Sequence, residues 1–152
     1  MNDNERRSAS FWDRRAATYG KTEAENSQLH TAMVERSLMY LGSDDVALDF
    51  GCGTGALSYR FAPHVKALHG VDISRQMINA AKDRADQEHV EGLHFSDGSI
   101  FNEVFQPDTY DVILTSQVLH VLSNRDGVVS RIHRLVKPGG WFLSTTPCMN
   151  ES

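Results

Sequence analysis

The sequence is short of cysteine, of long apolar runs and of basic clusters, and each shortage argues against a class of protein. Its two cysteines, Cys52 and Cys148, have no partners at the spacing of a zinc site, so we expect no metal centre and a reduced, cytoplasmic setting. No apolar run approaches the roughly 18 residues that cross a bilayer. The polar N-terminal segment also lacks the apolar stretch of a secretory signal. We therefore expect no membrane partner.

Basic residues are scattered, because no run of lysine or arginine exceeds two residues. The net charge is −5 and the isoelectric point is about 5.7. Proteins that neutralise many phosphates carry an obvious basic surface, so nucleic acid is disfavoured as a partner. The length of 152 residues, with 40% hydrophobic and 23% charged residues, is typical of one globular domain around one core.

Short apolar runs alternate with helical patterns along most of the chain. Each run has no more than six residues, which is too short for a globular helix, and several are rich in β-branched or aromatic residues. Such near-continuous apolar runs are typical of strands covered on both faces, as in a parallel sheet. The five predicted strands are Val46–Phe50, Ala67–Val71, Gly92–Phe95, Tyr110–Leu114 and Trp141–Thr145.

Helical patterns fill the segments between these strands. Apolar residues recur every four positions over 74–89, and one apolar face repeats over 128–136. Pro138 ends the second pattern, because the residue before proline is pushed out of the α region. The segment before the first strand predicts one or two helices, roughly Ser8–Thr18 and Glu23–Leu41. Alternating strands and helices with right-handed crossovers predict a doubly wound α/β sheet with helices on both faces.

The first strand leads into a loop with glycine at alternate positions, Gly51, Gly53 and Gly55. Glycine lets the backbone turn tightly and lets a ligand approach the main chain closely. In open α/β sheets ligands bind at the carboxyl ends of the strands. The spacing differs from the G-x-G-x-x-G dinucleotide fingerprint. A tight turn without a ligand is the alternative interpretation.

Asp72 ends the second strand and lies 17 residues after Gly55, since 72 − 55 = 17. A carboxylate at that position can accept hydrogen bonds from both hydroxyls of a ribose, and it would repel a 2′-phosphate. The alternative is that Asp72 caps a helix or lies in a solvated loop. Together with the glycine loop, Asp72 predicts a nucleoside-binding site.

With these motifs the sequence resembles the class I S-adenosylmethionine-dependent methyltransferases, and most of all the small-molecule branch that includes quinone-biosynthesis enzymes. The resemblance runs from about residue 11 to 147 and implies a Rossmann-like domain over 1–152. It divides the chain into a helical N-terminal lid, 1–42, and an α/β core, 43–152. The matching segments are Phe11–Tyr19, Leu48–Gly55, Gly70–Ser74, Phe95–Gly98, Tyr110–Leu122 and Leu135–Ser144.

The resemblance implies a set of residues that bind S-adenosyl-L-methionine. The glycine loop would line the methionine part of the cofactor, with Asp49 and Thr54 supporting its ammonium and carboxylate. Asp72 would hold the ribose, and Asp97 would accept the adenine amino group. The full implied set is Tyr19, Asp49, Gly51, Cys52, Gly53, Thr54, Gly55, Asp72, Ile73, Met77, Asp97, Gly98, Ser99, Ser116 and Gln117.

Several members of this set also have structural interpretations. Asp97 lies in a Ser-Asp-Gly sequence and could simply form the turn. Met77 falls on a helix face where core packing is the usual explanation. Cys52 is small enough to fill space between two glycines, and we do not expect it to act as a nucleophile.

The resemblance also implies methyl transfer to a small molecule by in-line displacement, in which positioning does much of the work. His120 follows the fourth strand, and histidine titrates near neutral pH, so it is the one candidate for a general base. The alternative is that His120 caps or packs the short helix there.

The family usually has seven strands, whereas this sequence shows five. We therefore expect a fragment in which Trp141–Thr145 is an exposed apolar edge strand, and the alternative is that a second copy or a partner covers that edge. Two other functions stay open. One is a regulatory module that binds the cofactor without turnover, and the other is a nicotinamide-dependent oxidoreductase, against which the glycine spacing argues.

Overall fold

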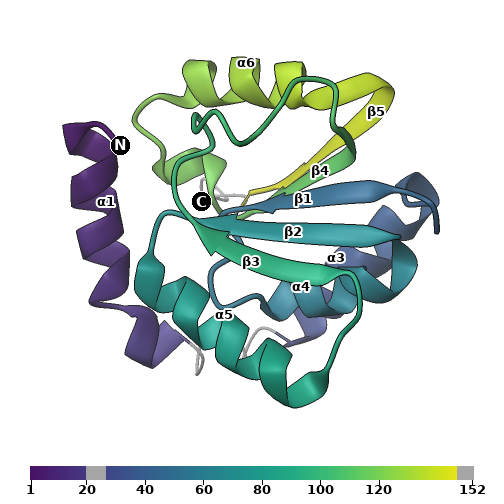
Figure 1. Ribbon diagram of the computed structural model, residues 1–152, viewed down its shortest axis with the longest axis horizontal. Coiled ribbons are helices and arrows are strands. Elements are labelled where there is room, and N and C mark those ends of the chain that lie inside the picture. Colours follow the sequence, from purple (N-terminus) through teal and green to yellow (C-terminus); the bar gives the residue numbers. More distant parts are fainter. Residues whose placement is uncertain (20–26, 147–152) are drawn as a thin grey trace, which may run out of the picture.

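In the computed structural model, which describes residues 1–19 and 27–146, five strands form one sheet in the order β3-β2-β1-β4-β5. Every pairing is parallel, so all strands end at the same edge of the sheet (Figure 1). The strands are β1 (Val46–Phe50), β2 (Ala67–Asp72), β3 (Leu93–Asp97), β4 (Tyr110–Ser116) and β5 (Val136–Thr145). The predicted doubly wound α/β fold is confirmed.

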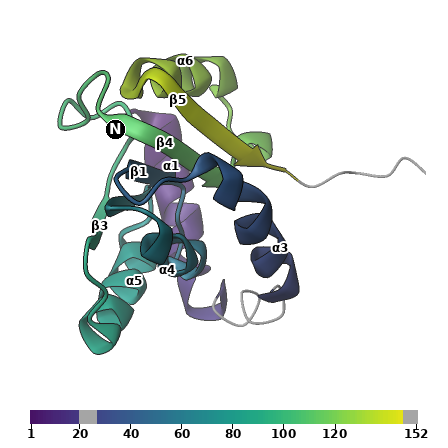
Figure 2. The ribbon, with the colours of Figure 1, turned by 90° about the vertical axis from the view of Figure 1, so that its right-hand side faces the viewer.

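Helices cover both faces of the sheet. In Figures 1 and 2, α6 lies on one face, and α3, α4 and α5 lie on the other. Figure 1 also shows α1 standing beyond the carboxyl ends of the strands. The helices are α1 (Asp3–Asp13), α3 (Ser27–Ser37), α4 (Ala56–Phe61), α5 (Arg75–Glu88) and α6 (Arg125–Leu135), with short 3₁₀ turns η1 (Leu38–Tyr40), η2 (Ala62–His64) and η3 (Leu119–Val121). Among the described helices, none is both long and apolar enough to span a bilayer.

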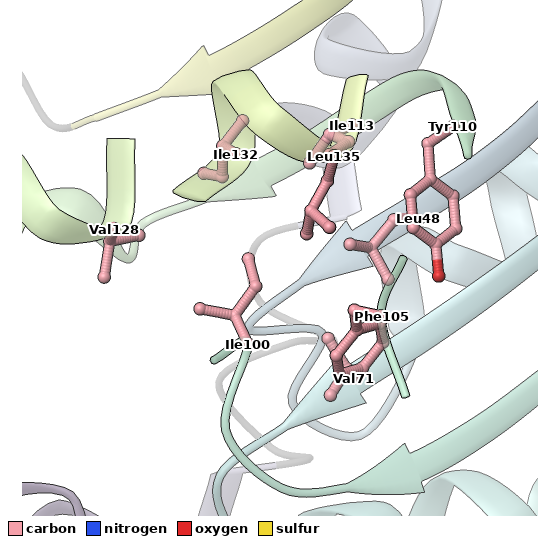
Figure 3. Close-up of a cluster of buried hydrophobic side chains, with 9 residues drawn as sticks. All are labelled: Leu48, Val71, Ile100, Phe105, Tyr110, Ile113, Val128, Ile132 and Leu135. Carbon is pink, nitrogen blue, oxygen red and sulfur yellow. The ribbon is translucent and has the colours of Figure 1, made fainter. Parts of the chain in front are cut away.

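The core lies in two layers because strand side chains alternate between the faces. On the α6 face, Leu48 and Ile113 pack with Leu135, and all three are fully buried (Figure 3). On the other face, Ala47 and Leu114 pack in a cluster with residues of α3 and α4. Burial on both faces explains why the strands read as continuous apolar runs.

The largest errors in the predicted boundaries concern two elements, whereas β2, β3 and β4 differ from the predicted strands by one or two residues at an end. The N-terminal helix runs over Asp3–Asp13 instead of Ser8–Thr18, because Asn2 and Glu5 form a capping box that starts it earlier. The strand predicted at Trp141 begins at Val136, directly after α6. A register shift against β4 and a positive φ of 81° at Gly139 let this segment remain in the strand. The start of the helix predicted over Glu23–Leu41 lies outside the described residues, and from Ser27 the chain forms α3 and then η1.

β5 is an edge strand, as the sequence predicted. It pairs with β4 on one side and stands at the end of the sheet order. Trp141 is 50% exposed there and makes an edge contact with Tyr40, with ring centroids 4.7 Å apart. What covers this edge in solution stays a prediction.

A stacked histidine pair makes the stability of the fold depend on pH. The rings of His69 and His94 stack at 4.3 Å, and Nε2 of His69 lies 2.6 Å from the Ser96 hydroxyl. Burial, and then the charge of His94, lower the pKa of His69 to about 4. The folded state thus disfavours the protonated ring of His69. The contribution of this side chain to the unfolding free energy is therefore complete above the ordinary histidine pKa of about 6.5. That contribution is lost as the pH falls from there towards 4.

We expect His69→Gln to remove part of this loss. Between about pH 7.5 and pH 5, the wild-type chain should lose on the order of 1–2 kcal/mol more unfolding free energy than the variant, after allowance for partial exposure. Urea titrations at both pH values measure the difference. His64→Gln, at an exposed position, is the matched control. Equal pH dependence in wild type and His69→Gln would contradict the assignment.

Candidate functional site

A cavity of about 200 Å³ opens at the carboxyl ends of the strands. Its wall is built from α1 and from the loops that follow β1, β2, β3 and β4. The lining residues are Asn2, Asn4, Glu5, Ser8, Trp12, Tyr19, Phe50, Gly51, Gly53, Asp72, Ile73, Met77, Gly98, Ser99, Ile100, Phe101, Ser116, Gln117, Val118, Val121, Leu122, Ser123, Asn124 and Val128. We call this the first cavity.

The glycine loop forms one side of the first cavity. Gly51, Gly53 and Gly55 all have positive φ, at 73°, 56° and 82°, a region that L side chains rarely adopt. The amides of Gly51 and Cys52 both donate to the carbonyl of Val71, at 2.8 and 3.1 Å, which folds the loop back over the end of β2. A Cβ at position 51 would lie 2.4 Å from a methyl carbon of Val118. The alternate glycines are therefore required by the bend itself.

Asp72 joins this loop to the end of β2. Its Oδ2 accepts from the amide of Gly53 at 2.9 Å, and its Oδ1 accepts from the amide of Ser74 at 2.8 Å. Burial raises the pKa of Asp72, while hydrogen bonds from the backbone amides of Ser74, Gly53 and Ile73 oppose the rise. A carboxylate has about four lone-pair sites, so three donors leave acceptor capacity beside the cavity. The glycine bend and the acid, far apart in the sequence, meet at one place.

The opposite side of the first cavity comes from the end of β4. Ser116 and Gln117 both line it, as the resemblance implied. Gln117 has a φ of 59°, a left-handed conformation that costs a non-glycine residue roughly 1–2 kcal/mol. Its amide donates to the carbonyl of Thr145 at 2.9 Å, which holds the strained turn against β5. Strain of this kind is concentrated at functional sites.

Helix α1 covers the first cavity through polar contacts. No side chain of α1 is fully buried. Near its start, Glu5 accepts a hydrogen bond from the Ser99 hydroxyl. At its end, Asp13 accepts from the Ser74 hydroxyl at 2.6 Å and from the amide of Gln76 at 3.1 Å. Asp13 thus caps the first turn of α5 from another part of the chain.

Ten of the fifteen residues implied for cofactor binding line the first cavity. They are Tyr19, Gly51, Gly53, Asp72, Ile73, Met77, Gly98, Ser99, Ser116 and Gln117. The other five, Asp49, Cys52, Thr54, Gly55 and Asp97, are not in its described wall.

Each of four outlying residues has a local explanation. Asp49 faces α4, where it accepts a hydrogen bond from the Ser58 hydroxyl at 2.5 Å, so it lies on the opposite face from the expected ammonium contact. Asp97 is exposed and lies 3.3 Å from Arg75. Gly55 caps α4 and packs so close to Phe95 that a Cβ would lie 2.7 Å from the ring. Cys52 is partly buried against the cluster of α4, α5 and β3, which agrees with its role as a small filler.

His120, the candidate general base, lies outside the described cavity wall. It is exposed and falls within the 3₁₀ turn η3, whose neighbouring residue Val121 does line the cavity. The structure therefore does not bring the imidazole to the first cavity.

Sequence reasoning implied a helical N-terminal lid but missed the residues of α1 and of the apolar rim that line the cavity. Asn2, Glu5 and Trp12 line the cavity, and the Asn-x-x-Glu capping box at the N-terminus was the signal that could have placed them on a helix. Phe101 and Val121 also line the cavity and are 42% and 51% exposed. Phe101 lies in a turn and Val121 in the 3₁₀ turn η3, and neither segment has an apolar period that would mark these side chains as cavity lining.

The carboxyl groups of the first cavity are those of Glu5 and Asp72, and the described wall contains no lysine, arginine or histidine. No cluster of three or more histidine, cysteine, aspartate or glutamate side chains with metal-binding geometry occurs among residues 1–19 and 27–146. The arrangement can thus accept hydrogen bonds from hydroxyl and ammonium groups and can enclose an apolar group.

Comparison with known proteins gives a consistent family. The methyltransferase domain family matches residues 41–152, which is more than half of the chain. The ubiquinone biosynthesis O-methyltransferase of Burkholderia vietnamiensis is 35% identical over 104 residues, covering 66% of this chain and 43% of that protein. The uncharacterized methyltransferase YcgJ of Bacillus subtilis is 31% identical over 96 residues, covering 63% of this chain and 38% of that protein. The chain thus spans about two fifths of the length of these relatives.

Solved structures agree with the sequence matches. The crystal structure of YcgJ superposes with a TM-score of 0.68 at 27% identity, covering 75% of this chain and 48% of that chain. Phosphoethanolamine N-methyltransferase 2 of Haemonchus contortus, in complex with S-adenosyl-L-methionine, gives a TM-score of 0.72 at 26% identity, covering 78% of this chain and 28% of that chain. On its fold, its glycine bend and these matches, the chain belongs to the class I S-adenosylmethionine-dependent methyltransferase family.

Proposed function

We propose that the chain binds S-adenosyl-L-methionine in the first cavity and transfers its methyl group to a small-molecule acceptor by in-line displacement. One observation carries the proposal: the amide of Gly53 donates to Asp72 at 2.9 Å beside an open cavity. Had the bend and the acid been far apart, or packed over by side chains, a single nucleoside could not have contacted both.

The residues of the first cavity fit the chemistry of the cofactor. Asp72 keeps acceptor capacity for ribose hydroxyls, and Ile73 and Met77 offer apolar surface for adenine. Gln117, at the end of β4, lines the cavity and has a side-chain carbonyl that can accept from an ammonium group. The bound cofactor would supply a methyl group on a sulfonium, which is a good leaving group.

The chain's own part in the reaction is to position the reactants and exclude water. Trp12 and Tyr19 from the N-terminal segment, which we propose as a lid, line the cavity together with Phe101 and Val121. Holding two reactants in a reactive geometry can supply roughly 7–11 kcal/mol of the barrier. No described histidine or lysine lines the cavity. We therefore assign the proposed rate enhancement to the positioning of the reactants and not to proton transfer by a side chain.

The acceptor is proposed as a small molecule because acidic walls suit neither a phosphate backbone nor an acidic substrate. The curated relative in Burkholderia vietnamiensis is an O-methyltransferase of ubiquinone biosynthesis, which supports small-molecule chemistry. A cytoplasmic setting, and a second copy or a partner over the edge of β5, remain predictions for this chain.

Calorimetry with S-adenosylhomocysteine, followed by a screen of small methyl acceptors, tests the proposal. We expect saturable binding of S-adenosylhomocysteine and product from at least one acceptor. Binding without product across the screen would favour the module that binds the cofactor without turnover. Displacement of the bound nucleoside by a nicotinamide dinucleotide, or no binding at all, would contradict the proposal.

We expect His120→Asn to retain turnover within about twofold with an acceptor found in that screen, which is an effect of less than about 0.5 kcal/mol on the barrier. The reason is that the side chain is exposed and lies outside the described cavity wall. Initial rates at saturating cofactor measure this, with His64→Asn as the surface control. Loss of turnover with unchanged S-adenosylhomocysteine binding would restore His120 as a general base.

A further inference from the structure

A second cavity, of about 400 Å³, lies on the face of the sheet that α3 and α4 cover. Its floor comes from three neighbouring strands, β1, β4 and β5, and its other walls from α3, η1 and α4. The lining residues are Met33, Asp49, Leu57, Phe61, Trp141 and Leu143, with Ser37, Tyr40, Leu114, Thr115, Ser116, Phe142, Ser144 and Thr145. Among the described lining residues, Ser116 is the one that also lines the first cavity.

Asp49 lies in the floor of this second cavity and is only 3% exposed. Its Oδ2 accepts from the Ser58 hydroxyl at 2.5 Å. Within the described part of the chain, no donor reaches its other oxygen, Oδ1, and no lysine, arginine or histidine forms an ion pair with it. A buried carboxylate without a cation is costly, because it loses hydration without regaining an opposite charge.

The remaining wall combines aromatic side chains with hydroxyl groups. Tyr40 and Trp141 meet edge to face, and Phe61 and Met33 also line the cavity. The hydroxyl residues of the lining are Ser37, Thr115, Ser116, Ser144 and Thr145. Aromatic faces attract cations, and the attraction is strongest where water is excluded. No cationic side chain lies among the described lining residues. Burial, before all other causes, raises the pKa of Asp49 to about 6, and a cation bound beside the carboxylate would favour its ionised form.

We propose that the second cavity binds a small organic cation, an alkylammonium or quaternary ammonium group. Its charge pairs with the Asp49 carboxylate, and its alkyl groups contact Met33 and the ring of Trp141. The site is separate from the cofactor site, because it lies on the other face of β1: Phe50 lines the first cavity, whereas Asp49, one residue earlier, lines the second.

A pair of isosteric probes tests the charge requirement. Choline carries a quaternary ammonium group, and 3,3-dimethyl-1-butanol has the same shape with a neutral carbon. Calorimetry on the 152-residue chain measures the binding of both probes. Choline should bind saturably, and the neutral alcohol should bind at least about tenfold more weakly. That difference in affinity corresponds to about 1.4 kcal/mol of binding free energy. No saturable binding of choline, or equal binding of both probes, would overturn the proposal.

Variants locate the probe within the molecule. Asp49→Asn removes the charge at nearly constant shape and should abolish the preference for choline, whereas Asp83→Asn, at an exposed position of α5, should preserve it. If circular dichroism shows that Asp49→Asn does not fold, the Trp141→Ala variant tests the site instead. Trp141 is 50% exposed, and its loss should weaken choline binding about fivefold or more, with Phe11→Ala, at a 40% exposed aromatic outside both cavities, as control.

Saturating S-adenosylhomocysteine separates the two cavities. We expect choline affinity to change less than about threefold in its presence, an effect of under 0.7 kcal/mol. Full displacement of choline by the nucleoside would place the cation in the first cavity and overturn the proposal. Because every readout is direct binding, this result does not depend on whether the chain methylates any acceptor.

Discussion

Replacing Asp72 by asparagine should weaken the binding of S-adenosylhomocysteine by about 100-fold or more. Hydrogen bonds to a charged acceptor contribute roughly 1.5–3 kcal/mol each. In the proposed complex, two hydroxyl groups of the ribose donate to the Asp72 carboxylate. The side chain also holds the amides of Gly53 and Ser74, so the loop itself would lose part of its anchoring. Calorimetry of the purified variant measures the change.

A matched control separates this effect from a general loss of acid. Asp83→Asn removes the same charge from an exposed position of α5 and should leave the affinity within about twofold, under 0.5 kcal/mol. Thermal unfolding of both variants shows whether Asp72→Asn still folds. If a folded Asp72→Asn variant binds S-adenosylhomocysteine within threefold of the wild-type affinity, the assignment of Asp72 to the ribose is wrong, and so is the proposed cofactor site.

Replacing Gly51 by alanine should destabilise the fold and close the site. The backbone there has a φ of 73°, and the new Cβ would lie 2.4 Å from a methyl carbon of Val118. The left-handed conformation costs roughly 1–2 kcal/mol, and overpacking adds roughly 1–3 kcal/mol. We therefore expect a loss of about 2–5 kcal/mol in unfolding free energy, together with loss of S-adenosylhomocysteine binding, because Val118 and the loop both line the cavity.

Gly139→Ala is the control for backbone strain alone. Gly139 has a similar φ of 81°, but nothing lies within 4 Å of an added Cβ. The decrease in unfolding free energy of Gly139→Ala should equal the conformational cost of roughly 1–2 kcal/mol, and nucleoside binding should be unchanged. Urea unfolding compares the two variants. Equal losses in both would mean that the contact with Val118 is not the cause.

The strands could be predicted well from the sequence because their signal is local. β1 begins and ends where its apolar run does, at Val46 and Phe50, and β2 extends the predicted run by one residue to Asp72. Burial on both faces forces nearly every position in such a strand to be apolar. The start of helix α1 was predicted less well, because the capping box of Asn2 and Glu5 marks it and no apolar run does.

The first cavity could be predicted in part. The glycine loop and Asp72 stand in fixed places relative to two strands, so parallel pairing brings them together. The side of the sheet that a single side chain faces was harder to judge. Asp49 belongs to the same motif as Gly51, yet strand alternation turns it toward Ser58 and the second cavity.

The sequence by itself determined the order of strands and helices, the glycine bend and the acid beside it, because propensity, periodicity and turn chemistry act over a few neighbouring residues. Only the tertiary structure decided that α1 covers the first cavity and that Asp49 lies in the second cavity. The hydrogen bonds of α1 join Glu5 to Ser99 and Asp13 to Ser74, across 94 and 61 residues of sequence. Contacts between segments so far apart follow from the packed fold, and no short-range pattern encodes them.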